Sequence, residues 1–367
     1  MVLTILLFTA LASLINLWFY VVPSARLVKH FRKKPPHATA SGSLDILLAA
    51  RNEAENLKQF LPTILDQDLQ ELGVLVVNDN STDGTARVLA QFEKEYPQLR
   101  VVSAFAKTSP GKKAALSEAI ATSTSKWILA TDADCKPSSS NWATKMLRVA
   151  DKETELVLGY GPYQKSAGWL NRWIRFEALY TAAQYLSAAA AGRPYMGVGR
   201  NMLYSRALYE RVGGFSSHAH LAGGDDDLLV NQGATPTNTK ICTTPDAWVH
   251  SVPHRTWSGY FRQKSRHLSV STTYKKTDQV WLGMLAVSHV AHFVGFIVLL
   301  LLGVWQFALL IYCVRLAVVW WRMRQIASSL GEGDLTTYLP ALDAGVCIYY
   351  VRFSLAALFP SSGKANW

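Results

Sequence analysis

Long apolar segments lie near both ends of the chain. Residues 1–25 carry no charged side chain, and this length matches the roughly 20 residues that cross a bilayer core, so we predict a transmembrane helix over residues 1–23. A second apolar region, Val280–Trp321, contains one charged residue, Arg315. The region is too long for one crossing, so two helices that turn near Gly303 are expected.

A final apolar stretch, Thr337–Phe359, closes a predicted membrane region of residues 280–360. It contains Asp343 and Arg352, and either charge at the bilayer centre would cost about 2.5–3.5 kcal/mol. A third C-terminal crossing and a helix lying in the interface therefore remain alternative predictions.

Between these ends, over residues 43–255, short apolar runs alternate with segments of helical spacing. This alternation predicts βαβ units, a parallel sheet and ligand binding at the carboxyl ends of the strands. The predicted strands are Leu44–Ala49, Gly73–Val77, Leu99–Val102 and Trp127–Ala130, and the predicted helices are Glu53–Leu65, Thr85–Tyr96 and Lys112–Ala121.

Polar residues follow three of these strands directly. Asp132 and Asp134 come after the fourth strand, where two carboxylates at i and i+2 suit a hard divalent cation such as Mg²⁺ or Mn²⁺. The alternative is a solvated turn in which Asp134 caps a helix. Asp79 and Asp83 follow the second strand in a segment whose residue types favour a turn. N-capping of the next helix would explain Asp83 well and Asp79 less well.

Five motifs in this order resemble the large family 2 of inverting glycosyltransferases. They lie within residues 44–268 and read LLAARNEAENL, VVNDNSTDGT, SPGKKAAL, TDADC and GGDDDLLV. The resemblance implies an α/β fold of the GT-A type, in which a Rossmann-like, mostly parallel sheet is flanked by helices. Here one N-terminal and two or three C-terminal transmembrane helices would be added.

The resemblance also implies a binding site for a nucleotide sugar, with a UDP-sugar as the expected donor. Ala50 and Glu53 would lie along the nucleotide, and Asp79 would accept a hydrogen bond from the base. Lys112 would approach the base or the diphosphate.

The TDADC segment looks like the family's DxD motif. By this resemblance Asp134 would be the principal ligand of Mg²⁺ or Mn²⁺, and Asp132 would touch the ribose or the metal. His250 or His254 is a further candidate ligand, although a loop histidine without a metal is the favoured interpretation.

The acidic run of GGDDDLLV aligns with the motif that holds the catalytic base in the family. Alignment on Asp227 puts Asp225 at the base position and Gly224 where the family usually has Glu. Asp226 is the alternative base if the register slips by one. A base is needed because the acceptor hydroxyl loses its proton as it attacks the anomeric carbon.

A basic segment, residues 256–279, contains QKSRH, which resembles the family's QxxRW motif with His267 in place of Trp. Gln263 would face the acceptor side and Arg266 the diphosphate, while attraction to anionic lipid accounts for part of the charge. The missing Trp and the small number of membrane helices favour transfer of one sugar. A processive polysaccharide synthase subunit and an inactive membrane scaffold of the same fold remain alternatives.

Residues 167–193 have apolar and aromatic side chains at helical spacing, interrupted by the charged residues Arg172, Arg175 and Glu177. They predict either an amphipathic helix in the headgroup layer or a helix of the domain core. Together with spans at both ends, the first alternative would hold the cleft against the bilayer. We therefore expect membrane lipids as partners and a lipid-linked, glycolipid or cell-surface glycan acceptor.

The charge distribution agrees with membrane topology. Lys and Arg exceed Asp and Glu by 37 − 26 = +11, but charged residues make up only 17% of the chain, below the usual ~25%. Basic residues concentrate beside the apolar segments, as in the linker over residues 24–42, so no nucleic-acid partner is expected. Such flanks stay on the cytoplasmic side, which predicts an inner-membrane protein with a cytoplasmic catalytic domain.

Overall fold

A seven-stranded mixed sheet carries the loops that form the candidate site. The computed structural model describes residues 1–33, 42–103, 111–221 and 223–358. The sheet has the order β3-β2-β1-β4-β7-β6-β8, and β5 pairs with β9 in a second, two-stranded sheet. The strands are β1 (Leu44–Ala50), β2 (Leu72–Asn78), β3 (Leu99–Ser103), β4 (Trp127–Ala130), β5 (Cys135–Pro137), β6 (Leu156–Leu158), β7 (Met202–Ser205), β8 (Thr239–Ile241) and β9 (Val249–Ser251).

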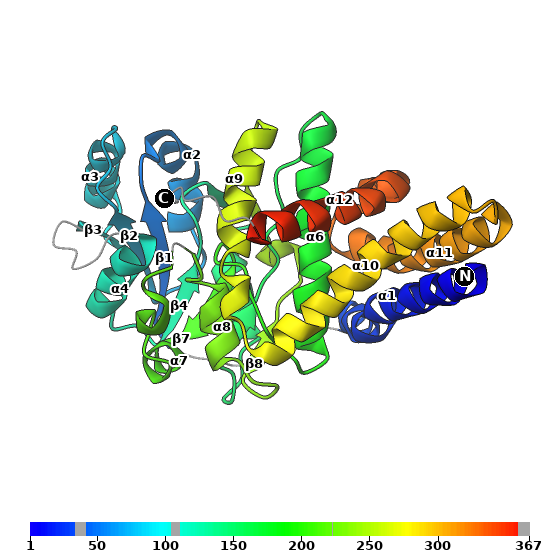
Figure 1. Ribbon diagram of the computed structural model, residues 1–367. Helices are drawn as coiled ribbons and strands as arrows, with labels where there is room; N and C mark the ends of the chain where they lie inside the picture. Colours follow the sequence, from blue (N-terminus) through cyan, green and yellow to red (C-terminus); the bar gives the residue numbers. More distant parts are fainter. Residues whose placement is uncertain (34–41, 104–110, 222, 359–367) are drawn as a thin grey trace.

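Helices cover both faces of the sheet and extend from it on one side (Figure 1). The helices are α1 (Val2–Phe31), α2 (Ala54–Leu65), α3 (Thr85–Glu95), α4 (Lys112–Thr122), α5 (Trp142–Arg148), α6 (Trp169–Ala190), α7 (Arg206–Arg211), α8 (Asp227–Gly233), α9 (Trp257–Leu268), α10 (Lys276–Leu301), α11 (Trp305–Ser329) and α12 (Leu339–Leu358). Short 3₁₀ helices are η1 (Ser216–His218), η2 (Pro245–Ala247), η3 (Ser271–Thr273) and η4 (Gly333–Tyr338).

The parallel half of the sheet agrees with the prediction. All seven residues of β1 are buried, as expected for a central strand covered on both faces, and β1 pairs in parallel with β2 and β4. No pattern in the sequence predicts that β7 runs antiparallel to both β4 and β6, as it does. The loops after β1, β2 and β4 therefore leave the same edge of the sheet.

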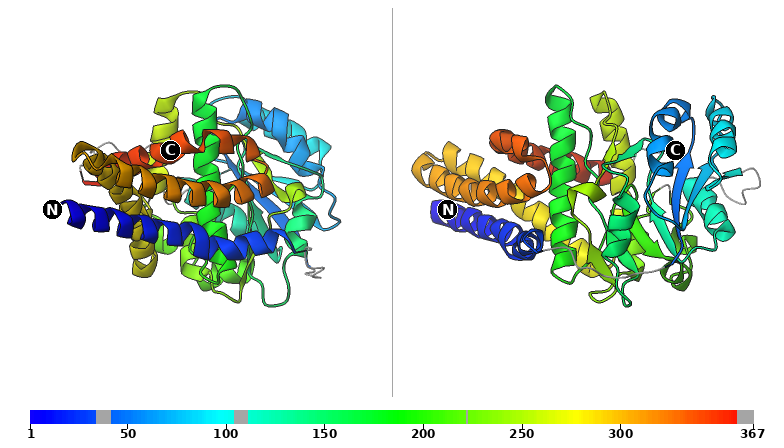
Figure 2. Two further views of the ribbon diagram at one scale, coloured as in Figure 1. Left: turned by 90° about the vertical axis from the view of Figure 1, so that its right-hand side faces the viewer. Right: turned by 180° about the vertical axis from the view of Figure 1, so that it is seen from behind.

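α6 belongs to the core, so of the two alternatives for residues 167–193 the core helix is the one observed. Its buried residues include Phe176 and Leu179, and it stands between the sheet and the helices that extend outward (Figures 1 and 2). Tyr180 of α6 packs on Tyr20 of α1, with 6.3 Å between ring centroids.

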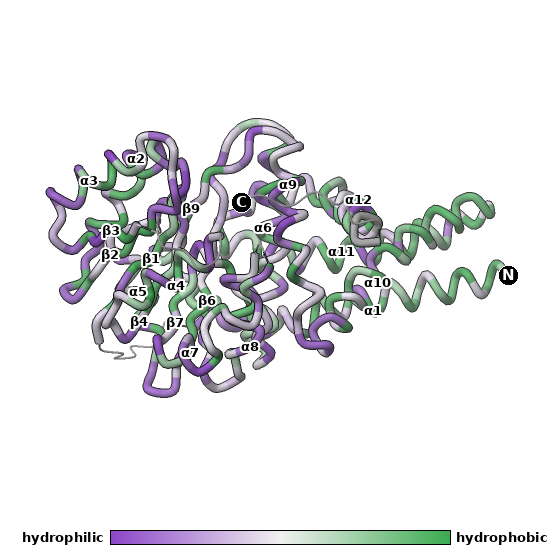
Figure 3. Tube along the Cα trace, turned by 60° about the vertical axis from the view of Figure 1, so that its left-hand side comes forward, coloured by the Kyte–Doolittle hydropathy of each residue, from purple (hydrophilic) through white to green (hydrophobic). Residues whose placement is uncertain are grey.

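Three helices of the described residues are long and apolar enough to cross a membrane: α1, α10 and α11. They project from a more polar domain as an apolar bundle (Figure 3). α1 continues through Pro23 to Phe31 and so includes the first part of the predicted linker over residues 24–42, of which residues 34–41 lie outside the described residues. α10 and α11 turn at Gly303, whose φ of +77° lies in the left-handed region that favours glycine.

The bundle and the sheet domain share one hydrophobic core. A single cluster of buried side chains joins Tyr20 and Leu27 of α1, Leu179 of α6, and Val319 and Met323 of α11. No break in packing separates the apolar bundle from the domain within this cluster.

α12 is not among the three candidate spans, but its acidic residue is neutralised inside the bundle. Asp343 forms a buried ion pair with Arg315 of α11, where Arg315 Nη2 lies 3.1 Å from Asp343 Oδ1. Arg315 also donates to Asn16 Oδ1 of α1 at 2.8 Å, and His289 of α10 contacts the main-chain oxygen of Asp343 at 3.0 Å. The cost expected from the sequence for an isolated Asp343 therefore does not apply, because its carboxylate is paired with Arg315.

Candidate active site

One cavity of about 800 Å³ lies at the carboxyl edge of β1 and β4 and continues beneath α9. Among its described lining residues are most of the predicted site residues: Glu53, Lys112, Asp132, Asp134, Asp225, Asp226, Gln263 and Arg266. Ala50 and Asp79 are not among them. They are buried behind the lining, where the Asp79 N–H donates to the Ala50 oxygen at 2.8 Å.

The loops after β1 and β2 are tied together by Asn52. Its N–H donates to Ser81 Oγ at 3.0 Å, and its Oδ1 accepts from the Thr82 N–H at 2.8 Å. Asn52 has a φ of +58°, a conformation that costs a non-glycine residue energy and often marks functional sites. Asp83 holds the same junction, accepting from the Ala54 and Thr85 N–H groups, as capping predicts.

Asp132, Asp134 and Cys135 form an acidic cluster in the turn between β4 and β5. One ligand atom of each lies within 4.8 Å of the others. Burial raises the pKa of Asp134 to about 7, and repulsion by Asp132 and Glu53 adds to this rise. A divalent cation would relieve this crowding, and carboxylate oxygens are the ligands that Mg²⁺ and Mn²⁺ prefer.

The histidine candidates lie apart from this cluster. His250 sits in β9 opposite Lys136, and neither His250 nor His254 is among the described residues that line the cavity. The described residues therefore offer carboxylates for a metal at this point.

Lys112, the first residue of α4, joins the two acidic segments. Its Nζ lies 2.9 Å from Asp132 Oδ1 and 2.9 Å from Asp225 Oδ2. Burial opposes its charge, but attraction by Asp132 and Asp225 outweighs burial and raises the pKa of Lys112 well above its ordinary value. The ammonium group therefore stays charged and links the DxD-like segment to the acidic run before α8.

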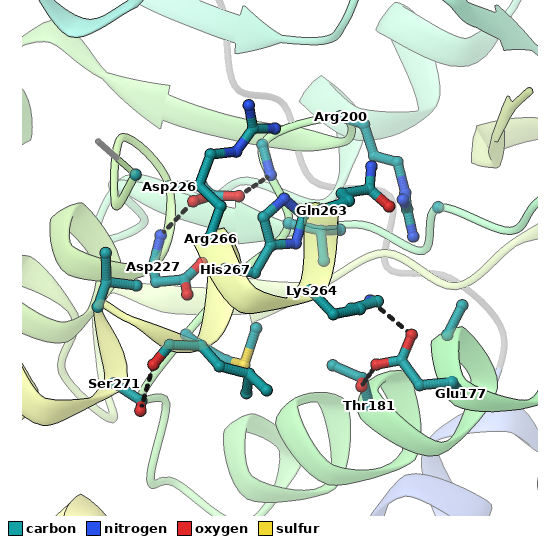
Figure 4. Close-up of a pocket in the computed structure, with 18 of the residues that line it drawn as sticks. Glu177, Thr181, Arg200, Asp226, Asp227, Gln263, Lys264, Arg266, His267 and Ser271 are labelled. Atoms are coloured by element: carbon teal, nitrogen blue, oxygen red, sulfur yellow. Dashed lines mark hydrogen bonds and ion pairs between the residues drawn. The ribbon is translucent and has the colours of Figure 1, made fainter. Parts of the chain in front are cut away.

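The three consecutive aspartates of that run have different partners. Asp226 caps α8, accepting from the Asp227 N–H at 2.8 Å and from the Gly199 N–H at 2.7 Å (Figure 4). Asp227 accepts from the Tyr274 hydroxyl at 2.6 Å. Of the three, only Asp225 pairs with a side-chain cation within the described chain.

Their pKa values diverge accordingly. Burial raises the pKa of Asp225, but Lys112 outweighs burial and leaves that pKa below its ordinary value. Burial and repulsion by Asp225 raise the pKa of Asp226. Burial and the charge of Asp226 raise the pKa of Asp227 well above its usual range.

The backbone conformation explains why Gly224 stands where the family's motif usually has Glu. Its φ of +90° strains any side chain, and a Cβ there would lie 2.7 Å from Leu228 Cδ1. The usual Glu of the family's motif does not fit this backbone. The preceding loop is held by Lys113, whose Nζ donates to the Gly223 oxygen at 2.9 Å.

α9 carries the QKSRH residues along one wall of the cavity. Gln263, Arg266 and His267 line it, and burial lowers the pKa of His267 well below its ordinary value. Lys264 forms a buried ion pair with Glu177 of α6, with Nζ 2.5 Å from Oε2, and Glu177 also accepts from Thr181 (Figure 4).

Two features of the site were not predicted. Arg200, in the loop before β7, lines the cavity and stacks 4.5 Å from the Tyr163 ring centroid. Its charge partly opposes the rise in the pKa of nearby Asp134. The Glu177–Lys264 pair was also missed, because its partners lie on helices far apart in the sequence. No local pattern marks either feature.

Comparison with known proteins decides the family of this domain. Residues 45–213 match the family model described as glycosyl transferase family 2. The chain carries a family 2 glycosyltransferase domain. It is 31% identical over 116 residues to a beta-monoglucosyldiacylglycerol synthase of Nostoc, covering 30% of this chain and 24% of the relative.

A poly-beta-1,6-N-acetyl-D-glucosamine synthase of Staphylococcus epidermidis is 25% identical over 119 residues, which cover 32% of this chain and 28% of that protein. The chain thus spans about a quarter of the length of these two relatives. The mannosyltransferase PcManGT of Pyrobaculum calidifontis, solved with GDP-Man and Mn²⁺, superposes with a TM-score of 0.62 at 19% identity over 99% of this chain and 100% of its own. This likeness confirms the predicted GT-A fold.

Proposed function

We propose that the protein is a membrane-bound inverting glycosyltransferase that moves one sugar from a nucleotide sugar to a lipid-borne hydroxyl. The observation that carries this proposal is the position of Lys112 between Asp132 and Asp225. Asp132, Asp134 and Asp225 line the same cavity around this lysine, which supports a metal pair and a base that act at one carbon, as a single displacement requires.

In this proposal Asp134 and Asp132 hold Mg²⁺ or Mn²⁺. The ion, when bound, supplies charge stabilisation to the leaving diphosphate. Glu53 lies beside these carboxylates, and Arg200 and Arg266 are the cations that face the diphosphate. Ala50 and Asp79 remain predicted nucleotide contacts that support the loops from behind the lining.

The reaction is one in-line displacement. Asp225 takes the proton from the acceptor hydroxyl while the oxygen of that hydroxyl bonds to the anomeric carbon. The bond from that carbon to the donor's diphosphate breaks, and its electron pair leaves with the nucleoside diphosphate. A pKa kept low by Lys112 leaves Asp225 ionised and ready to accept the proton.

The acceptor is proposed to come from the membrane. Three apolar helices adjoin the domain, and the cavity reaches α10 and α12. A relative named as a glucosyldiacylglycerol synthase supports a lipid acceptor. Basic flanks beside α1 and α11 support an inner-membrane location with the catalytic domain in the cytoplasm.

A panel of nucleotide sugars tests this function. Full-length protein in detergent is titrated with UDP-, GDP- and TDP-sugars by calorimetry, with and without Mn²⁺, and nucleotide release is then followed with the donors that bind. We expect binding and release with at least one donor. If no donor in the panel binds, with or without Mn²⁺, the proposal is wrong.

A further inference from the structure

The cavity extends beyond the proposed reaction centre to the surfaces of three helices. On α10 it is lined by Leu282, Gly283 and Ala286, which share one helical face, and on α12 by Val346 and Tyr349. We call the part of the cavity lined by α6, α10 and α12 the membrane lobe. Because α10 is a candidate span, this lobe lies where the domain meets the bilayer.

The membrane lobe is apolar at its far end. Gly283 faces open space, since a Cβ there would meet no atom within 4 Å. Further toward the C-terminal end of α10, His289 contacts the main-chain oxygen of Asp343 at 3.0 Å and packs against Tyr350. These contacts close the gap between α10 and α12. The lobe therefore offers hydrocarbon-lined space beside the cytoplasmic end of α10.

Charge in the membrane lobe is already balanced. Among the described lining residues on its three helices, Glu177 is the single charged one, and it pairs with Lys264 of α9 at 2.5 Å. Asp227, which also lines the cavity, accepts a hydrogen bond from the Tyr274 hydroxyl. The described lining residues on α6, α10 and α12 leave no spare cation for an anionic headgroup, and Arg266 of α9, which lines the same cavity, is assigned in the proposed function to the donor's diphosphate.

This charge pattern discriminates between lipid acceptors. A lipid phosphate would lose its water in the lobe without a cation to replace it, which is unfavourable. As a nucleophile it would also approach the carboxylates of Asp225 and Asp226, and it would not need a base. A neutral hydroxyl avoids the repulsion and uses Asp225.

We infer that the acceptor is an uncharged lipid alcohol whose hydrocarbon chains occupy the membrane lobe. This inference rests on the proposed function, because it names the acceptor class for the same reaction. The chains would lie against Gly283, Ala286 and Val346, and the hydroxyl would pass the Glu177–Lys264 pair to reach Asp225.

The acceptor class is tested with full-length protein in phosphatidylcholine vesicles and the donor found by the panel. Three probes are compared: dioleoylglycerol, the short-chain dioctanoylglycerol and a polyprenyl phosphate. We expect sugar transfer to both glycerolipids and none to the polyprenyl phosphate. Preferred transfer to the polyprenyl phosphate would overturn the inference while leaving the glycosyltransferase function standing.

The lobe is tested with a matched pair of variants on α10. Gly283→Phe fills the lobe, whereas Met284→Phe adds the same ring about 100° further round the helix, away from the lobe, where Met284 is 49% exposed. We expect Gly283→Phe to lower transfer to dioleoylglycerol about 10-fold or more, as blocking an apolar pocket does, and Met284→Phe to leave it unchanged. Donor binding by calorimetry verifies that both variants are folded.

The two failures are distinguishable. Equal transfer by both variants overturns the lobe as the acceptor site. Absence of donor binding and of nucleotide release in the unmodified protein instead contradicts the proposed function itself.

Discussion

Lys112 Nζ lies 2.9 Å from Asp225 Oδ2, so the proposed base is paired with the first lysine of α4. The same ammonium group holds Asp132. One cation therefore sets the charge state of the base and links it to the carboxylates proposed to hold the metal.

Replacement of this lysine should change the pH dependence of transfer. In Lys112→Gln, burial and the neighbouring Asp226 remain while the attraction is lost, so the pKa of Asp225 rises. Because the base works deprotonated, the acidic limb of the kcat/KM profile should move to higher pH by about 1 unit or more. The profile is measured at saturating donor, with Lys94→Gln on exposed α3 as the control. An unmoved limb would show that Lys112 does not tune the base.

Asp225 and Asp226 should respond differently to the same isosteric change. Asp225→Asn should keep donor binding nearly intact and lower the transfer rate by about 10²-fold or more, because it removes the base. Asp226→Asn perturbs a helix cap and should cost about 1 kcal/mol of stability with a smaller effect on rate. Turnover and thermal unfolding are measured for both. The reverse ranking of rates would assign the base to Asp226.

The acidic cluster should make the reaction metal-dependent. Asp134→Asn removes the proposed principal ligand and should lower nucleotide release by about 10²-fold or more at saturating Mn²⁺. Excess chelator should abolish release in the unmodified protein, and added Mg²⁺ or Mn²⁺ should restore it. Glu153→Gln, in an exposed turn, serves as the control. Full activity in chelator would refute the metal role.

The charges inside the helix bundle should matter for stability. Arg315→Met leaves Asp343 buried without its partner and should destabilise the protein by about 3 kcal/mol or more. The double variant Arg315→Met/Asp343→Leu should recover most of that loss, since neither charge remains. Unfolding in detergent is followed by circular dichroism. Equal destabilisation by the single and double variants would contradict this account.

The parallel strands were predictable because each is a short apolar run followed directly by polar residues. Leu44–Ala49 and Trp127–Ala130 are found with nearly the predicted bounds as β1 and β4. The antiparallel β7 was not predicted, because Met202–Ser205 is short and its direction depends on the preceding loop.

Most candidate site residues were accessible from the sequence because they stand at strand ends, where topology brings them together. Ion pairs and hydrogen bonds between distant segments could not be predicted from the sequence. Glu177 meets Lys264, and Arg315 meets Asn16 299 positions away, only after the helices pack. Asp343 seemed costly from the sequence for the same reason: its partner lies on another helix.

The continuous core that joins Tyr20 and Leu27 to α6 and α11 determines how this protein should be prepared for assays. A truncated, water-soluble fragment without residues 1–33 would strip one wall from that core and uncover aromatic rings of α6 that α1 otherwise shields. Such a fragment would aggregate, or the packing around α6 would become looser. Faithful enzymology and inhibitor screening therefore call for the intact polypeptide in a native-like lipid environment.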